Sequence, residues 1–349
     1  MQFTHDWLAQ RVRFATGGAS EAVAEEVRRL EASRVMAIAS DPSRAEPVLA
    51  GVPVEVLHTD VAMHVPVEVA ERARSVAADH GVDALVSVGG GSTTGLAKAI
   101  ALTTGLPIVV VPTTYAGSEA TDVWGLTEHG RKTTGVDARV LPRSVVYDAS
   151  LMLGLSVPTS VASGFNALAH CVDAMWAPRT DPIDQVLALE GIRALRHGLP
   201  RVVADPWELD GREQTLYGAY VAAVAFASAG SGLHHKICHV LGGMFGLPHA
   251  ETHAVVLPHV LALNAPAVPQ LDHRMAEALG AGSALTGVLV LRDETDAPRS
   301  LRDLGLDADD LPSAVPAILD AAPPGNPTAV TAGNIEALLR AAWEGKEPA

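Results

Sequence analysis

Histidines are concentrated in one short segment of the chain. Residues 232–259 read GLHHKICHVLGGMFGLPHAETHAVVLPH and hold six of the 14 histidines in 349 residues. If residues 232–241 are helical, His235 and His239 project from one face, and His249 follows after two glycines. Such imidazoles can bind a metal, donate protons or, when protonated, bind an anion. Packing accounts for a single buried histidine but not for six together, so the segment predicts a functional site.

Two polar loops form a second group of candidates, and each follows an apolar run that predicts a buried strand, at residues 84–88 and 107–111. The glycines of the first loop would let backbone N–H groups and a helix N-terminus approach a pyrophosphate. A glycine turn by itself is equally typical of a tight connection, but its place at the end of a central strand favours phosphate binding. The residues predicted to bind a nucleotide are Gly89, Gly90, Gly91, Ser92, Thr93, Lys98, Thr113, Thr114, Tyr115 and Ser118.

The order of predicted elements divides the chain into two domains. Up to about residue 150, strands at 34–39, 54–57, 84–88 and 107–111 alternate with helices at 21–30, 66–80 and 93–102, which predicts a parallel sheet with right-handed crossovers. After residue 160 the periodicity is helical, at 161–176, 182–194, 212–229, 232–241, 254–263 and 334–343. We therefore predict an α/β nucleotide-binding domain over residues 1–155 and an all-helical catalytic domain over residues 156–349, with a cleft between them.

Composition excludes several classes of protein. The formal net charge of -15, without a run of Lys or Arg, argues against a nucleic-acid partner. The first residues lack the apolar core of a signal peptide, and no apolar run approaches the length of a membrane span, so we expect a cytoplasmic protein without a membrane partner. The two cysteines, Cys171 and Cys238, fit a reducing compartment and are expected to fill space beside the histidines rather than to bind a metal.

Three motifs in this order resemble the iron-containing alcohol dehydrogenase superfamily: the glycine loop with Lys98, the PTTYAGSEAT loop, and the spacing of His235, His239 and His249. With SGFNALAHCVDAMWAP, they are similar to its maleylacetate reductase branch. The resemblance covers almost the whole chain and implies the dehydroquinate synthase-like fold of that superfamily, an α/β domain followed by an all-α domain. It also implies a homodimer that reduces maleylacetate, a dicarboxylate, to 3-oxoadipate with NADH or NADPH, in the bacterial breakdown of aromatic compounds. Ser40 and Asp41 follow the first predicted strand, where an acidic residue would favour NADH.

The resemblance also assigns candidate site residues. Metal-dependent relatives bind their ion with one Asp and three His, and the matching positions here are Asn166, His170, His235 and His249. His239 matches a further active-site histidine. An amide has no charge and is a weak oxygen ligand, so Asn166 predicts that no metal is bound tightly. Gly95 stands where many relatives have Asp, and the loop at Tyr115 is one residue shorter than usual, as in the maleylacetate reductase branch.

The chemistry of an enone explains how a metal could be dispensed with. Hydride added to the carbon β to the ketone of maleylacetate gives a delocalised enolate, which needs less Lewis-acid help than an alkoxide. We predict that His170, His235, His239 and His249, helped by Lys236, bind the dianion, which raises their pKa, and supply the proton. Two alternatives stay open: a metal-dependent alcohol or aldehyde dehydrogenase of the same fold, and a ligand-binding protein with an inactive site.

Overall fold

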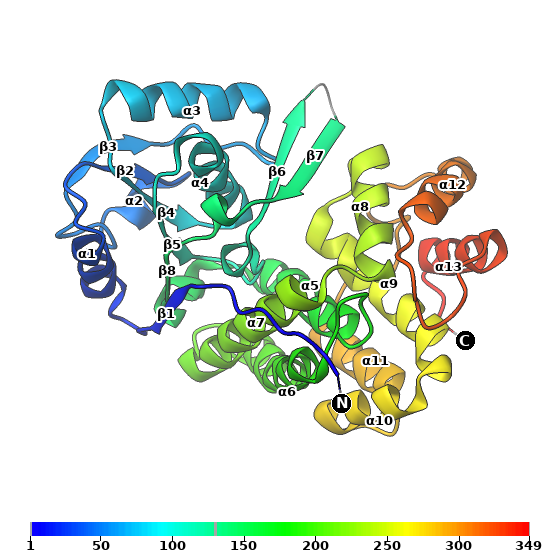
Figure 1. Ribbon diagram of the computed structural model, residues 1–349. Coiled ribbons are helices and arrows are strands. Elements are labelled where there is room, and N and C mark those ends of the chain that lie inside the picture. The colour runs from blue at the N-terminus through cyan, green and yellow to red at the C-terminus, as the bar shows by residue number, and fades with distance from the viewer. Residues whose placement is uncertain (1, 129–130, 349) are drawn as a thin grey trace. The chain divides into compact units, whose positions relative to one another are not determined.

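The computed structural model describes residues 2–128 and 131–348 and divides into two compact units (Figure 1). One unit is Trp7–Leu155, and the other is Ser156–Ala349 together with Met1–Asp6. The predicted division assigned the first six residues to the nucleotide-binding domain, but this segment belongs to the helical unit. The reason is a contact that sequence patterns do not reveal: the ring Nδ1 of His5 lies 2.7 Å from Oδ2 of Asp181.

The first unit is built on a six-stranded sheet whose order is β1-β8-β5-β4-β2-β3 and whose neighbouring strands are all parallel. The strands are β1 (Arg11–Phe14), β2 (Val35–Ile38), β3 (Val54–His58), β4 (Ala84–Gly89), β5 (Ile108–Pro112) and β8 (Ser144–Tyr147). The helices of this unit are α1 (Ala19–Arg29), α2 (Pro42–Ala45), α3 (Val67–Asp79) and α4 (Gly91–Thr104). Short 3-10 turns lie at Ser118–Ala120, Ala138–Val140 and Ala149–Gly154, and an antiparallel ribbon is formed by β6 (Val123–Glu128) and β7 (Arg131–Val136).

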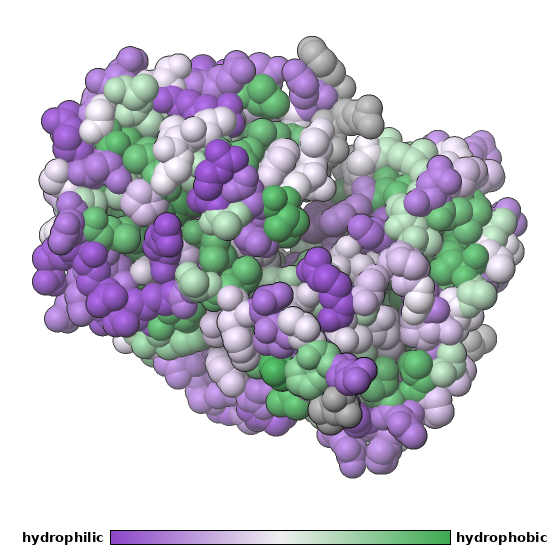
Figure 2. Space-filling model, viewed as in Figure 1, coloured by the Kyte–Doolittle hydropathy of each residue, from purple (hydrophilic) through white to green (hydrophobic). Residues whose placement is uncertain are grey.

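Burial of both faces explains why the central strands are continuous apolar runs. Val35 and Ala37 of β2 pack in a core with α1, whereas Met36 and Ile38 pack in the core on the other face with α3 and α4. Alternation of the two faces along each strand therefore places helices on both sides of the sheet. The four predicted strands and the predicted parallel sheet are confirmed. In Figure 2, hydrophilic side chains dominate the visible surface around α1.

The second unit contains only helices among its described residues. They are α5 (Val157–Ala174), α6 (Pro182–Ala204), α7 (Leu209–Ala229), α8 (Leu233–Phe245), α9 (His249–Asn264), α10 (Pro269–Leu279), α11 (Ala284–Thr295), α12 (Leu311–Ala321) and α13 (Ala332–Glu344), with 3-10 turns at Ala265–Ala267 and Ala308–Asp310. Every residue of α5 from Ser160 to Ala174 is buried, because α6, α7, α8 and α9 all contact this helix. The all-helical prediction is confirmed, and α5 is the central helix that positions the site.

One helical stretch in the described part of the chain, Pro269–Thr295, is long and apolar enough by composition to span a membrane. The stretch consists of α10 and α11, which are separated at Gly280, where φ is 68°. The pair α7 and α8 passes the same test only if it is counted as one span bent by 97°. Core helices of globular domains pass this test as well, so the finding is weak evidence for a membrane segment.

Candidate active site

The two predicted nucleotide loops lie side by side at the carboxyl ends of β4 and β5. Gly89 pairs with Pro112, and the backbone N–H of Thr113 donates to the carbonyl of Gly89 at 3.0 Å. Gly89 has a φ of 155°, and a Cβ at this position would lie 2.4 Å from Oγ1 of Thr93, so the turn into α4 requires glycine. The helix begins directly after this turn, which turns its free N–H groups toward the same edge of the sheet.

The structure separates the ten predicted nucleotide-binding residues by accessibility. The partly exposed ones, which a ligand can reach, are Gly90, Gly91, Ser92, Thr113, Thr114 and Ser118. The buried ones are Gly89, Thr93, Lys98 and Tyr115, whose side chains, where present, shape the two loops from within. Contact with a cofactor thus stays a prediction for the partly exposed residues, whereas the buried residues support the shape of the loops.

Lys98 corrects the sequence prediction most clearly. Its side chain is buried, and Nζ donates to the carbonyls of Ser118 at 2.6 Å, Thr121 at 2.8 Å and Val123 at 2.9 Å, and approaches Oγ1 of Thr121 at 3.0 Å. Burial lowers the pKa of Lys98 to about 7, yet four acceptors and no donor surround Nζ, which favours the ammonium form. The amine therefore holds the second loop in shape and is not directed at a pyrophosphate.

Six histidine rings from three helices form one continuous cluster in the helical unit. The rings belong to His170 on α5, His234, His235 and His239 on α8, and His249 and His253 on α9. The centre of the His235 ring lies 4.8 Å from that of His170 and 4.4 Å from that of His253. His253 is in turn 4.4 Å from His249, whose ring stacks on His239 at 5.8 Å. The structure therefore brings together four of the five predicted catalytic residues.

Helical spacing explains this arrangement. His235 and His239 are one turn apart on α8, and His249 and His253 are one turn apart on α9, which packs against α8. Gly246, with a φ of 67°, ends α8 and allows the chain to turn into α9. Within the cluster His239 and His249 are exposed, while His235 and His253 are buried. The exposed pair forms the accessible edge of the cluster and the buried pair its interior.

Asp173, which the sequence analysis missed, holds His235 in place. Its Oδ2 accepts hydrogen bonds from Nδ1 of His235 at 2.7 Å, from the backbone N–H of His235 at 3.1 Å and from that of Gly232 at 3.0 Å. Since a carboxylate only accepts, Nδ1 carries the hydrogen and Nε2 of His235 is turned toward the cluster. A Cβ on Gly232 would lie 2.3 Å from Oδ1 of Asp173, so this close approach requires glycine.

Two further neighbours complete the surroundings of the cluster. His253 is fully buried, and neither ring nitrogen has a hydrogen-bond partner among the described residues. The ring of Phe226 of α7 contacts the rings of His170 at 4.6 Å and His235 at 4.4 Å between ring centres, in a tilted arrangement. The spacing of four residues after His249 could have identified His253, and the spacing of three after His170 could have identified Asp173. No sequence signal marks Phe226.

Burial and mutual repulsion keep the buried rings neutral in the unliganded protein. The pKa of His170 is lowered to about 3 and that of His234 to about 4, chiefly by desolvation and then by the other histidines. The same causes lower the pKa of His235 and His253 well below 6.5. Burial raises the pKa of Asp173 to about 7, against the hydrogen bonds that stabilise its charge. The predicted rise of the histidine pKa values therefore requires the charge of a bound dianion.

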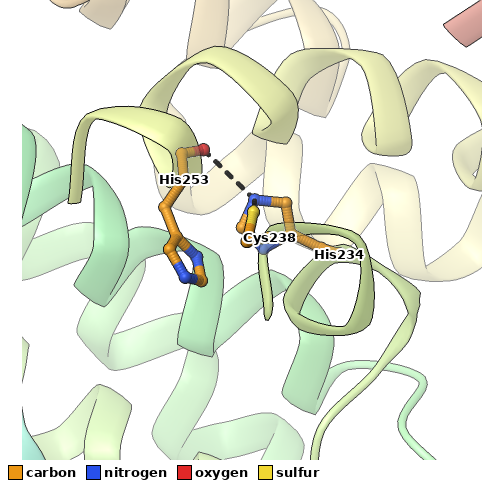
Figure 3. Close-up of side chains that lie close together, drawn as sticks. All are labelled: His234, Cys238 and His253. Carbon is orange, nitrogen blue, oxygen red and sulfur yellow. Dashed lines mark hydrogen bonds between the residues drawn. The ribbon is translucent and has the colours of Figure 1, made fainter. Parts of the chain in front are cut away.

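His234 and Cys238 have structural roles at the edge of the cluster. Nε2 of His234 donates to the backbone carbonyl of His253 at 3.1 Å and so ties α8 to α9 (Figure 3). The thiol of Cys238 lies 3.7 Å from the same nitrogen. Burial raises the pKa of both Cys171 and Cys238, which keeps them protonated and agrees with their predicted role as small fillers.

Donor atoms that could share a metal ion lie in three groups among the described residues. These groups are His234 with Cys238 and His253, Asp173 with His234 and His235, and His5 with Asp181 and Asp184. None of them contains His170 or His249, so the residues at the metal-ligand positions of the resembled family do not converge on one point. The fourth of those positions is the buried amide of Asn166.

Lys236, the fifth predicted catalytic residue, lies next to His235 on α8 and interacts electrostatically with Asp173, but it points to another side of the helix. It follows His235 on α8, so its side chain leaves the helix about 100° away. With Arg179 it lines a cavity of about 310 Å³. The sequence analysis did not identify Arg179.

Comparison with known proteins places the whole chain in one group. Residues 9–149 match the family model "Iron-containing alcohol dehydrogenase", and residues 160–343 match "Fe-containing alcohol dehydrogenase family, C-terminal". The chain is 43% identical to maleylacetate reductase from Pseudomonas sp. strain P51 over 100% of this chain and 99% of the relative.

Two solved structures are similar over the full length. The crystal structure of an iron-containing alcohol dehydrogenase from Corynebacterium glutamicum has a TM-score of 0.98 and 56% identity, covering 100% of this chain and 98% of that one. Maleylacetate reductase from Agrobacterium tumefaciens has a TM-score of 0.95 and 42% identity, covering 100% of both chains.

Proposed function

The chain belongs to the iron-containing alcohol dehydrogenase family, in its maleylacetate reductase branch, and we propose that it reduces the carbon–carbon double bond of maleylacetate with NADH or NADPH. The observation that carries the proposal is the cluster of imidazoles on α5, α8 and α9 with the amide of Asn166 beside it. This arrangement supplies proton donors. It also places a neutral amide, instead of a carboxylate that would compete with the substrate for the histidines, at the position that matches a metal ligand. Full-length similarity to several maleylacetate reductases supports the same substrate.

The proposed reaction adds one hydride and one proton to the enone. The reduced nicotinamide supplies the hydride, which bonds to the carbon β to the ketone while the π electrons move onto the ketone oxygen. The resulting enolate then takes a proton at the carbon α to the ketone, which gives 3-oxoadipate. His235 is the proposed source of this proton, directly or through a water, because Asp173 orients its ring and compensates the charge when the imidazole is protonated.

Binding of the dianion is proposed to provide the protonation that the empty cluster lacks. The buried rings are neutral because protonated rings would repel one another and would not be solvated by water. Two carboxylates in the site would offset both effects, so we expect substrate binding to be coupled to proton uptake. The exposed pair, His239 and His249, is the proposed first contact for the substrate.

The side chains at the metal-ligand positions do not fit the ion that the family name implies. A tight site needs ligand atoms around one point and usually a carboxylate, and here His170 and His249 join no group of converging donors among the described residues. We therefore propose that turnover does not depend on a bound metal.

Other features of the proposal concern the cofactor and the assembly. Asp41 and Arg44 lie 3.3 Å apart just beyond the carboxyl end of β2. The carboxylate suits the ribose hydroxyls of NADH and the guanidinium suits the 2′-phosphate of NADPH, so both cofactors are proposed to be accepted. We also propose a cytoplasmic homodimer without nucleic-acid or membrane partners, as the resemblance and composition predict; light scattering of the purified protein tests the dimer.

A substrate panel combined with metal analysis tests the proposed function. The purified protein is incubated with NADH or NADPH and maleylacetate, before and after dialysis against a chelator, and separately with NAD⁺ or NADP⁺ and small alcohols. We expect oxidation of the reduced cofactor by maleylacetate that survives chelation. Turnover of alcohols that is lost to the chelator and restored by iron would instead identify a metal-dependent alcohol dehydrogenase, the activity named for the relative from Corynebacterium glutamicum. No turnover of any substrate would favour a binding protein.

A further inference from the structure

A positively charged cavity lies beside the first turn of α8, within the helical unit. It is open to solvent, has a volume of about 310 Å³ and is lined by Pro178, Arg179, Ala229, Gly230, Ser231, Lys236, Ala321, Ala322, Pro323 and Pro324. Two lining residues are cations and none is Asp or Glu. In a chain with 40 acidic and 25 basic residues, two cations that line one cavity without a carboxylate indicate a site for an anion.

Arg179 is held rigidly at the wall of this cavity. Its Nε donates to the carbonyl of Ser228 at 3.0 Å and its Nη2 to that of Ala227 at 3.0 Å, while its backbone N–H donates to Ala229 at 3.1 Å. These contacts cap the C-terminus of α7, which accounts for two of the five guanidinium N–H groups. The other three have no acceptor among the described residues, so they remain available as donors at the helix end.

Lys236 is the second cation that lines the cavity. Its side chain is half-buried and forms no hydrogen bond or ion pair with a described residue. The nearby carboxylate of Asp173 attracts the ammonium, but it is fully buried and its Oδ2 is already taken by three other hydrogen bonds. Helix capping explains the position of Arg179 but not why Lys236, which forms no hydrogen bond with a described residue, lines the same cavity.

We infer that this cavity, which we call the Arg179–Lys236 pocket, binds the substrate carboxylate that lies beyond the ketone. The inference rests on the proposed function. The other carboxylate is conjugated to the reacting double bond and must stay with the histidines, whereas the carboxylate beyond the ketone follows a tetrahedral carbon and can turn into a pocket on the next side of α8. Lys236 follows His235 on α8, so the pocket and the proposed proton donor are one residue apart along the helix.

The chemistry of the walls agrees with this occupant. The two cations match one carboxylate, which can accept hydrogen bonds from both a guanidinium and an ammonium. The remaining wall of Ala321, Ala322 and Pro323 is apolar and suits the methylene that carries the carboxylate. A cavity of this size accommodates a short carboxylate arm without demanding a large ligand.

A comparison of two substrates tests the pocket. Maleylacetate is compared with cis-4-oxopent-2-enoate, which keeps the enone and its conjugated carboxylate but ends in a methyl ketone. For Lys236→Met we expect KM for maleylacetate to rise about tenfold to a hundredfold, the range for loss of a charged hydrogen bond. KM for the methyl ketone should stay the same, so the preference for the dicarboxylate collapses. Arg179→Lys, which keeps a cation at the helix end, should show the same pattern with a smaller rise.

Lys346→Met is the matched control, because it changes the net charge equally at an exposed lysine outside the pocket. An unchanged preference in both pocket variants overturns the inference, as does an equal rise of KM for both substrates, which indicates a structural defect.

Adipate binding separates this inference from the proposed function. If the unmodified protein reduces neither substrate, the proposed function is wrong, and the pocket is judged by titration with adipate followed by thermal stabilisation. Weakening of adipate binding by about tenfold or more in Lys236→Met, but not in Lys346→Met, supports a carboxylate pocket. Equal binding by all three proteins overturns it.

Discussion

Replacement of Asp173 by Asn tests whether the carboxylate acts on His235 or only on the fold. The variant keeps an oxygen that can accept from the backbone N–H of Gly232, but it removes the charge and adds an amide whose hydrogens point to a buried region where Oδ1 has no described partner. Losing a charge-assisted hydrogen bond at a fully buried site costs about 2 to 3 kcal/mol. The melting temperature of the helical unit should therefore fall by roughly 4 to 12 °C.

The chain contains a matched control for this change. Asp181 also receives a histidine Nδ1, from His5 at 2.7 Å, and two backbone N–H groups at a helix N-terminus, from Ile183 at 2.7 Å and Asp184 at 3.0 Å. Both carboxylates are nearly fully buried. Asp181→Asn should therefore lower the melting temperature by a similar amount, but its histidine lies outside the ring cluster.

Activity distinguishes the two variants. In Asp173→Asn, protonated His235 loses its compensating charge, and we expect kcat for maleylacetate to fall about a hundredfold, within the range for a general acid, with a smaller change in KM. Asp181→Asn should keep kcat within about threefold of the parent protein, since it removes no group from the cluster. The kcat and KM values of the two variants are compared by steady-state kinetics at a temperature well below both melting temperatures. Equal loss of kcat in both variants, or no loss in Asp173→Asn, would refute the argument.

Four further predictions concern the nucleotide loops, the metal and acid stability. Gly91→Val should raise KM for NADH or NADPH about tenfold or more, because a side chain at this position would block a pyrophosphate. The loop should stay folded, since the added Cβ meets only Ala116 at 3.8 Å in the protein. An unchanged KM would show that the cofactor does not bind at this loop. Lys98→Met should weaken cofactor binding by a similar factor and lower the melting temperature, since three carbonyls lose their donor. An unaltered KM would show that the second loop does not contribute to cofactor binding. Elemental analysis should find substoichiometric metal in the parent protein and tighter binding in Asn166→Asp, whereas one tightly held ion per parent chain would contradict the prediction. Burial lowers the pKa of His259 to about 4, below its unfolded value near 6.5, so the unfolded chain takes up a proton first as the pH falls. Between pH 6.5 and 4, this group should therefore lower the free energy of unfolding by about 1.4 kcal/mol for each pH unit of acidification. Denaturant unfolding between pH 7 and 4 measures the slope, which should flatten in His259→Gln.

Periodicity was sufficient for the elements whose pattern is local. The apolar runs of β2, β4 and β5 and the helical spacing of α5 to α8 follow from burial of whole strands and of helix faces, which the order of residues displays directly. The edge strand β1, with the sequence Arg11–Phe14, has only partial burial and no apolar run, and β6 and β7 form a separate ribbon, so these elements were not predicted. Their existence depends on pairing with segments distant in the chain.

The candidate site shows the same division between local pattern and distant contact. The sequence by itself identified the histidine segment and the two loops, because residue type and short spacing carry that information, while the resemblance to the family indicated that Asn166 stands in place of a carboxylate ligand. Only the tertiary structure decided that Lys98 binds loop carbonyls, that Asp173 orients His235, and that Arg179 shares a cavity with Lys236. Each of these results joins residues of different elements, and a side chain's partner and its exposure are set by how the chain folds back on itself, which no local pattern encodes.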